Sequence, residues 1–136
     1  MNKKLTHSFS LKVNKEDIDA LNHVNNIRYV QWVQNAARKH WKLLCEANFD
    51  ATYVWVVLRH EIDYLSSAKL NDELTVYTWI GTSFGVKSER FVEIKKGIKL
   101  IAKAKTIWCL LDKETMKPIR IPPKVMKILE FESDQD

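Results

Sequence analysis

Residues 17–48 read DIDALNHVNNIRYVQWVQNAARKHWKLLCEAN, a polar stretch followed by a long apolar-periodic one. From about residue 26, apolar side chains recur every three or four positions, which predicts a helix over 26–48. A surface helix normally carries one apolar stripe about 100° wide, whereas this segment carries two stripes side by side. We therefore expect a helix that is mostly enclosed, as a curved sheet would enclose it. The stripes consist of Val30, Val33, Ala37, Trp41 and Leu44, and of Tyr29, Trp32, Ala36, His40 and Leu43.

The rest of the chain predicts strands. Leu5–Val13 alternates strictly between apolar and polar side chains, which is the period of a half-buried strand. One helix followed by several strands is an α+β layout, in which one curved antiparallel sheet of about five strands covers one long helix. Four strands are predicted after the helix, over 53–65, 73–83, 87–96 and from 98 onward, and a short helix over 123–129. Ile98, Leu100, Ala102, Ala104 and Thr106 are predicted to share the inner face of the last strand, where the small alanines leave room for the helix.

Length and composition are those of one ordinary globular domain. The chain has 136 residues, of which 46% are hydrophobic and 29% charged, and we expect a single domain over 1–136 with residues 130–136 frayed. No run approaches the ~18 apolar residues that would suggest a membrane span. The start, Met-Asn-Lys-Lys followed by an alternating segment, lacks the apolar region of a signal peptide, so we expect a cytoplasmic protein.

Charge and metal-binding residues narrow the class of ligand. The net charge of +5 fits nucleic acid, a membrane surface or a polyanionic small ligand such as coenzyme A. The basic residues are scattered without a block of five, which disfavours a nucleic-acid partner. Two distant cysteines and four dispersed histidines form no spacing typical of a metal site, so we expect neither a metal nor a cofactor.

The polar loop before the helix carries acid and base groups. Asp17, Asp19 and His23 precede a helix start, where free backbone N–H groups and the positive end of the helix dipole can hold a developing oxyanion. Two residues apart in an extended loop, the two carboxylates would point to opposite sides. We therefore expect only one of them to face a pocket. The alternative is that either residue merely caps the helix or belongs to a turn.

The D-x-D pattern at 17–19, continued as H-V-N-N-x-x-Y at 23–29, resembles a known family signature. The loop resembles that of hotdog-fold acyl-CoA thioesterases of the 4-hydroxybenzoyl-CoA thioesterase-like group, and the continuation is similar to the acyl-ACP thioesterase branch. The resemblance extends from about Leu5 to Leu111. It implies a hotdog fold, and it implies that Asp19 is the catalytic carboxylate, as general base or as nucleophile, while Asp17 holds the loop.

The resemblance also implies roles for neighbouring residues. His23 would orient Asp19 or donate a hydrogen bond to the thioester or the leaving thiolate. In the plant-type acyl-ACP relatives an Asn lies two residues after the Asp; this position is Leu21 here, and the neighbouring Asn22 is the candidate. We expect the thioester oxygen near the N–H groups of Asn26 and Ile27. Tyr29 is expected in the core or in the pocket wall and not as a proton donor.

Basic residues on the later strands are candidates for binding the nucleotide of coenzyme A. Arg59 lies on the strand that commonly pairs with its twin in hotdog dimers, and Lys87 and Arg90 follow a predicted hairpin turn. The alternative is that they are ordinary interface, surface or turn residues. Because a sheet with a free edge invites a symmetric partner, we expect a homodimer or homotetramer in which these residues serve the partner's site.

These expectations combine into one function. The chain would hydrolyse an acyl-CoA thioester to a free acid and CoA, with Asp19 at the reaction and the start of the helix as the oxyanion hole. Three alternatives stay open: an acyl-ACP thioesterase, a hotdog-fold acyl-CoA hydratase or dehydratase, and a binding module that holds acyl thioesters without turnover.

Overall fold

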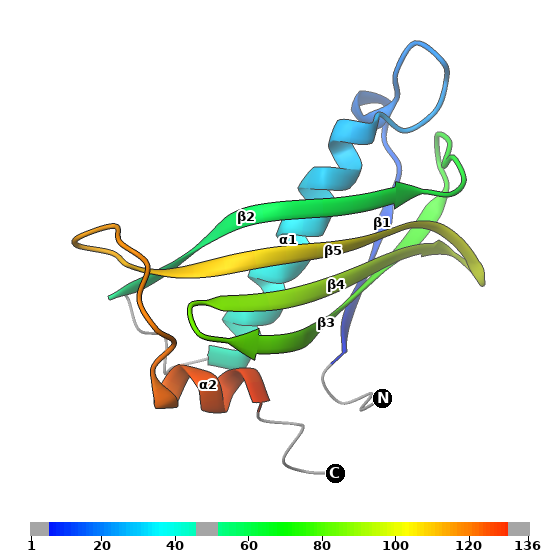
Figure 1. Cartoon of the computed structure of the whole chain (residues 1–136). Coiled ribbons are helices and arrows are strands. Elements are labelled where there is room, and N and C mark those ends of the chain that lie inside the picture. Colours follow the sequence, from blue (N-terminus) through cyan, green and yellow to red (C-terminus); the bar gives the residue numbers. More distant parts are fainter. Residues whose placement is uncertain (1–5, 46–51, 131–136) are drawn as a thin grey trace.

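A curved antiparallel sheet wraps around one long helix in the computed structural model, which describes residues 6–45 and 52–130 (Figure 1). The sheet order is β1-β3-β4-β5-β2, so β1 and β2 are its edges. This is the layout that the sequence predicts. The strands are β1 (His7–Lys12), β2 (Tyr53–Tyr64), β3 (Glu73–Phe84), β4 (Lys87–Lys96) and β5 (Lys99–Asp112). The helices are α1 (Asn26–Cys45), α2 (Pro123–Glu130) and the short 3-10 helix η2 (Lys15–Asp17).

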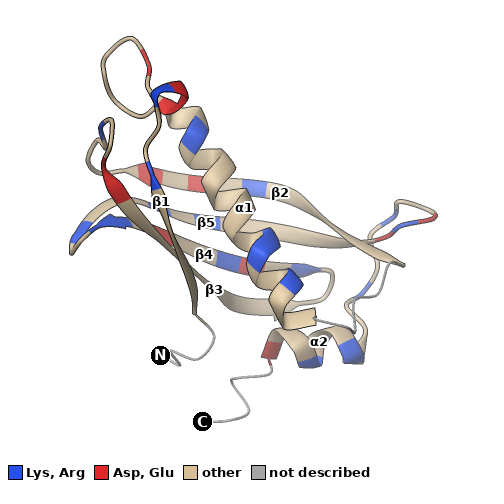
Figure 2. Cartoon of the chain, turned by 180° about the vertical axis from the view of Figure 1, so that it is seen from behind, with Lys and Arg blue, Asp and Glu red and all other residues tan. Residues whose placement is uncertain are grey.

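Helix α1 lies against the concave face of the sheet. Trp32, Val33 and Ala36 of α1 join the main core with inward residues of β3, β4 and β5. Ala102 and Ala104 are almost fully buried on β5, as predicted. Arg38, Lys39 and Lys42 of α1 are exposed, and Figure 2 marks the basic positions along this helix in blue.

A second apolar cluster closes the other end of the molecule. Leu110 of β5 and Ile80 of β3 pack there against Val125 and Leu129 of α2, with Trp41 of α1 alongside. Helix α2 therefore covers the end of the sheet beside the C-terminal half of α1 (Figure 1). In the part of the chain that the structure describes, neither helix is long and apolar enough to cross a membrane.

Two details of the sequence prediction are wrong. Ile98, predicted on the inner face, is 100% exposed, because Gly97 at φ +60° makes it part of the turn between β4 and β5. Leu43, predicted in an apolar stripe of α1, is 55% exposed. Leu5, the predicted helix end at 46–48 and the tail from 131 lie outside the described residues.

Candidate functional site

Asp17 fastens the loop to the start of α1. Its side chain is buried and accepts hydrogen bonds from Asn14 N at 2.8 Å and from Arg28 Nε at 2.6 Å, the latter within an ion pair. Its backbone carbonyl accepts from Asn25 N at 2.8 Å. Asp17 is therefore a structural anchor, the role that the sequence predicts for it.

Asp19 begins a tight turn that ends at His23. Asp19 N donates to His23 O at 2.9 Å, and Asn22 N donates to Asp19 O at 3.0 Å. Asn22 has φ +63°, a left-handed conformation that asparagine adopts more readily than most residues. Leu21 N donates to Asp19 Oδ1 at 2.8 Å, which orients the carboxylate. Asp19 is hydrogen-bonded within this turn and takes no part in the ion pair of Asp17 with Arg28.

The first turn of α1 is capped by Asn25. Its Oδ1 accepts from Ile27 N at 3.0 Å, and its backbone carbonyl accepts from Arg28 N at 2.9 Å. Val24 N donates to Ala68 O at 2.9 Å, which ties the helix start to the segment after β2. Among the hydrogen bonds between described residues, none engages the N–H of Asn26. This N–H is therefore the free donor of the first turn.

A hollow of about 450 Å³ lies where the loop, the first turn of α1 and the segment after β2 meet. The structure brings Asp19, His23, Asn26 and Tyr29 together around it. A carboxylate, an imidazole and a helix N-terminus thus share one concave surface, which is the combination needed for acyl transfer.

Tyr29 forms a wall of this hollow. It is 2% exposed, its hydroxyl accepts from Ala68 N at 3.2 Å, and its ring makes an edge contact with Trp32 at 5.4 Å between centroids. Burial raises the pKa of the Tyr29 hydroxyl, so this group stays protonated at neutral pH. The geometry supports the predicted wall position.

Residues 64–67, which the sequence analysis did not select, form the opposite wall. Tyr64, Leu65, Ser66 and Ser67 line the hollow, and the N–H groups of Leu65 and Ser66 donate to Ile101 O at 2.9 and 3.1 Å. A short polar stretch after a strand is a weak sequence signal, because such stretches occur in most loops. Contacts made by the next residue, Ala68, with Val24 N and with the Tyr29 hydroxyl bring this stretch to the start of α1.

The remaining candidates lie elsewhere in the subunit. Asn22 is exposed and does not line the hollow. Arg59 is exposed on β2 and pairs with Glu61 at 3.1 Å, and Lys87 is exposed at the start of β4. Arg90 is only 6% exposed and points into the space between the sheet and α1. A residue that binds the phosphates of CoA should lie at the surface, and Arg90 does not.

Metal-binding clusters are absent from the described residues: no three His, Cys, Asp or Glu side chains come together there. Cys45 and Cys109 are buried free thiols, and burial raises the pKa of Cys45 to about 11. At the loop, the titratable groups that line the hollow and could take part in a reaction are those of Asp19, His23 and the tyrosines.

The family follows from a match over most of the chain. A sequence model of the thioesterase-like superfamily matches residues 13–129, from the end of β1 into α2. The chain belongs to the thioesterase-like superfamily. This match includes the whole loop, helix α1 and the four strands that follow, so the predicted membership of a thioesterase family is confirmed.

Named relatives of this thioesterase-like chain agree with that assignment. It is 28% identical over 125 residues to the acyl-CoA thioesterase YbgC of Haemophilus influenzae, with 87% of this chain and 90% of that protein covered.

Solved structures share the fold of this superfamily member. A predicted thioesterase from Bacillus stearothermophilus superposes with a TM-score of 0.84 at 20% identity, covering 93% of this chain and 96% of that one. SAV2348 of Staphylococcus aureus, solved in complex with CoA, gives a TM-score of 0.81 at 18% identity, covering 96% of this chain and 84% of that one. The predicted hotdog fold is confirmed.

Proposed function

We propose that this protein hydrolyses an acyl-CoA thioester to a free acid and CoA. The observation that carries the proposal is the meeting of the Asp19 carboxylate with the free N–H of Asn26 in one hollow. Membership of the thioesterase-like superfamily supports the reaction class, and the relative named an acyl-CoA thioesterase supports the CoA carrier.

Asp19 is the reactive carboxylate in this proposal. One of its oxygens is oriented by Leu21 N–H. The carboxylate either attacks the thioester carbonyl carbon, giving an anhydride and CoA thiolate, or takes a proton from a water that attacks the same carbon. Water then hydrolyses the anhydride in the first route. Both routes end in the free acid and the thiol of CoA.

The thioester oxygen is held at the start of α1. Asn26 N–H has no acceptor among the described residues, and the dipole of a 20-residue helix favours negative charge there. Ile27 N–H already donates to Asn25 Oδ1. It would join the oxyanion hole only if the Asn25 side chain turned away, so Asn26 is the first donor.

His23 and Asn22 act differently in this proposal. His23 lines the hollow and is within the same turn as Asp19, so it would donate a hydrogen bond to the thioester or to the leaving thiolate. Asn22 acts through its backbone, since its left-handed conformation closes the turn that presents Asp19.

A second subunit would complete the site. Strand β2 is a 12-residue edge strand with a bulge between Val57 and Arg59, and unpaired edges of this length invite a symmetric partner. In a homodimer or homotetramer joined there, exposed Arg59 and Lys87 would be available to the phosphates of CoA bound to the partner. Arg90 is not proposed to bind these phosphates, because its side chain is buried.

Release of free thiol tests the function directly. Wild-type protein is incubated with short, medium, long and aromatic acyl-CoAs, and with matching acyl-ACPs. Turnover of at least one acyl-CoA is expected, with acyl-ACP hydrolysed less well. Hydrolysis of acyl-ACP but of no acyl-CoA would show that the carrier is ACP and not CoA. Hydration of enoyl-CoA without thiol release would indicate a lyase, and binding without either reaction would indicate a binding module.

A further inference from the structure

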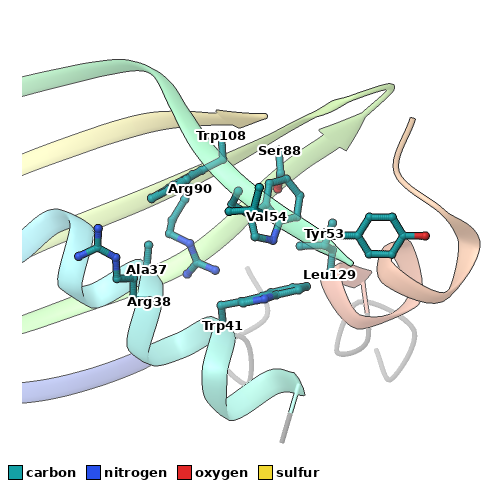
Figure 3. Close-up of a pocket in the computed structure, with 10 residues that line it drawn as sticks. Ala37, Arg38, Trp41, Tyr53, Val54, Ser88, Arg90, Trp108 and Leu129 are labelled. Atoms are coloured by element: carbon teal, nitrogen blue, oxygen red, sulfur yellow. The ribbon is translucent and has the colours of Figure 1, made fainter. Parts of the chain in front are cut away.

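A second cavity lies at the other end of α1, far from the Asp19 loop. It has a volume of about 230 Å³ and is lined by the C-terminal half of α1, the start of β2, strands β4 and β5, and α2 (Figure 3). Three tryptophans, Trp41, Trp55 and Trp108, and Leu129 give it a mainly apolar lining. At 1.5 Å per helical residue, Ala37 in this cavity is roughly 16 Å along α1 from Asn26.

One full positive charge is buried in this apolar cavity. Arg90 is 6% exposed and points into the cavity toward Trp41 (Figure 3). Burial lowers the pKa of Arg90 to about 10, so the guanidinium is still protonated at neutral pH. Among the ion pairs between described residues, none includes Arg90.

The hydrogen-bond partners of Arg90 are neutral. Arg90 Nη1 donates to His40 Nδ1 at 2.8 Å and to Thr78 Oγ1 at 3.1 Å. The Thr78 hydroxyl in turn donates to Phe91 O at 2.9 Å. Burial and the charge of Arg90 lower the pKa of His40 to about 3, so its imidazole is uncharged at neutral pH. These contacts hold the guanidinium in place without neutralising it.

Unused donors remain in the cavity. A guanidinium has five N–H groups, and the two on Nη1 are engaged. The groups on Nη2 and Nε have no acceptor among the described residues. The Nε1–H of Trp108, which lines the same cavity, is also buried without a partner. An unpaired buried charge and an unpaired buried donor each destabilise a protein unless an acceptor arrives.

We propose that this cavity binds a small organic carboxylate, with the carboxylate on Arg90 and Trp108 Nε1 and the apolar body against the tryptophan rings. A carboxylate supplies two acceptor oxygens in the fork geometry that suits a guanidinium. The volume exceeds the roughly 150 Å³ of an engineered apolar cavity that binds benzene. It therefore suits an arylalkanoate or a medium-chain carboxylate.

Tryptophan fluorescence of the intact protein provides the binding assay, because three tryptophans line the cavity. The probes are 3-phenylpropionate, the uncharged 3-phenylpropanamide of nearly the same shape, and formate. We expect the acid to bind at least about tenfold more tightly than the amide and than formate. Equal binding of acid and amide, or no binding of the acid, would overturn the proposal. Formate binding as tightly as the acid would also overturn it, since the apolar body would then play no part.

Two variants locate the site. Arg90→Met keeps the bulk and removes the charge, and it should abolish the preference for the acid over the amide. Ala37→Leu keeps Arg90 but fills the cavity, and it should weaken binding of both acid and amide. Arg120→Met changes an exposed arginine outside the cavity lining and should leave both affinities unchanged. An undiminished preference for the acid in a folded Arg90→Met would rule the site out, and Ala37→Leu tests the cavity if Arg90→Met does not fold. The assay is independent of thioester hydrolysis, so either proposal can fail alone.

Discussion

Two aspartates separated by one residue have different environments in the loop before α1. Asp17 is buried and bonded to Asn14 and Arg28, whereas Asp19 faces the hollow with one oxygen held by a backbone N–H. Ile18 between them has an extended backbone, a conformation in which alternate side chains share a side only when no turn intervenes. The D-x-D spacing therefore predicts that one carboxylate holds the loop in place while the other faces a pocket. The hydrogen bonds with Asn14 and Arg28 show that Asp17 holds the loop.

Asp17→Asn is expected to destabilise the fold by about 1–3 kcal/mol. The substitution removes a buried charge partner, but Arg28 keeps a side chain that is 35% exposed and can be hydrated, so the loss should be less than for a fully buried pair. Urea unfolding measures it. Asp63→Asn, an exposed aspartate on β2, is the matched control and should change the stability by less than about 0.5 kcal/mol. Equal stability of the two variants would contradict the anchoring role.

At the level of elements, α1 and the sheet are joined by a polar layer inside an apolar core. His40 of α1 stacks on His7 of β1 at 5.6 Å between ring centroids and accepts from Arg90 of β4. Burial, Arg90 and His7 lower the pKa of His40, and burial, Lys39 and Arg90 lower that of His7. The layer is neutral at its histidines and positive at Arg90, so acid should loosen the contact between α1 and the sheet.

The free energy of unfolding should therefore fall as the pH drops from 7 to 5. In the unfolded chain His40 binds a proton near its ordinary pKa of 6.5, whereas in the folded protein it does so only near 3. Between these values the unfolded state holds more protons, so acid lowers the free energy of unfolding, by about 2 kcal/mol for His40 alone at pH 5. The lowered pKa values of His7 and His60 act in the same direction.

His40→Asn tests this pH dependence. Asparagine retains an oxygen that can accept from Arg90 but does not titrate, so the variant should lose less stability between pH 7 and pH 5 than the wild type. Denaturant unfolding at the two pH values gives the difference. An identical pH dependence in the two proteins would show that the pKa of His40 is not lowered in the fold.

Sequence patterns predicted the helices and strands better than the tertiary contacts between them. The helix start, the five strands and α2 follow from local periodicity, and the loop motif identified Asp19, His23, Asn26 and Tyr29 as neighbours. Residues 64–67 were not predicted because only tertiary contacts, such as that of Val24 N with Ala68 O, bring them to the loop. Arg90 was predicted to bind the nucleotide of coenzyme A and is instead buried, because alternation on a strand shows which side chains share a face but not which cavity that face lines.

At the level of the whole molecule, the proposed association of subunits depends on the free edge of β2. This 12-residue strand pairs with β5 on one side, no described strand pairs with its other side, and Leu58 at its bulge is 53% exposed. A symmetric pairing of two β2 strands would join two sheets into one. It would also place exposed Arg59 of each subunit near the other subunit.

Light scattering should give two or four times the mass of the chain at micromolar concentration. Leu58→Lys should weaken the association by about tenfold or more, since a charge would then lie at the edge that pairs. Ile98→Lys places the same charge on a fully exposed turn and should leave the mass unchanged. A wild-type protein that is monomeric at all concentrations, or a Leu58→Lys that associates as wild type does, would contradict pairing through β2.

The central claim is that Asp19 performs thioester hydrolysis, and kcat of Asp19→Asn on the best acyl-CoA substrate tests it most directly. Asparagine preserves the size of the side chain and removes the base and nucleophile. The account predicts a fall in kcat of about 10³-fold or more, with the melting temperature and the binding of the acyl-CoA retained. A folded variant whose kcat stays within about threefold of wild type would remove Asp19 from the reaction.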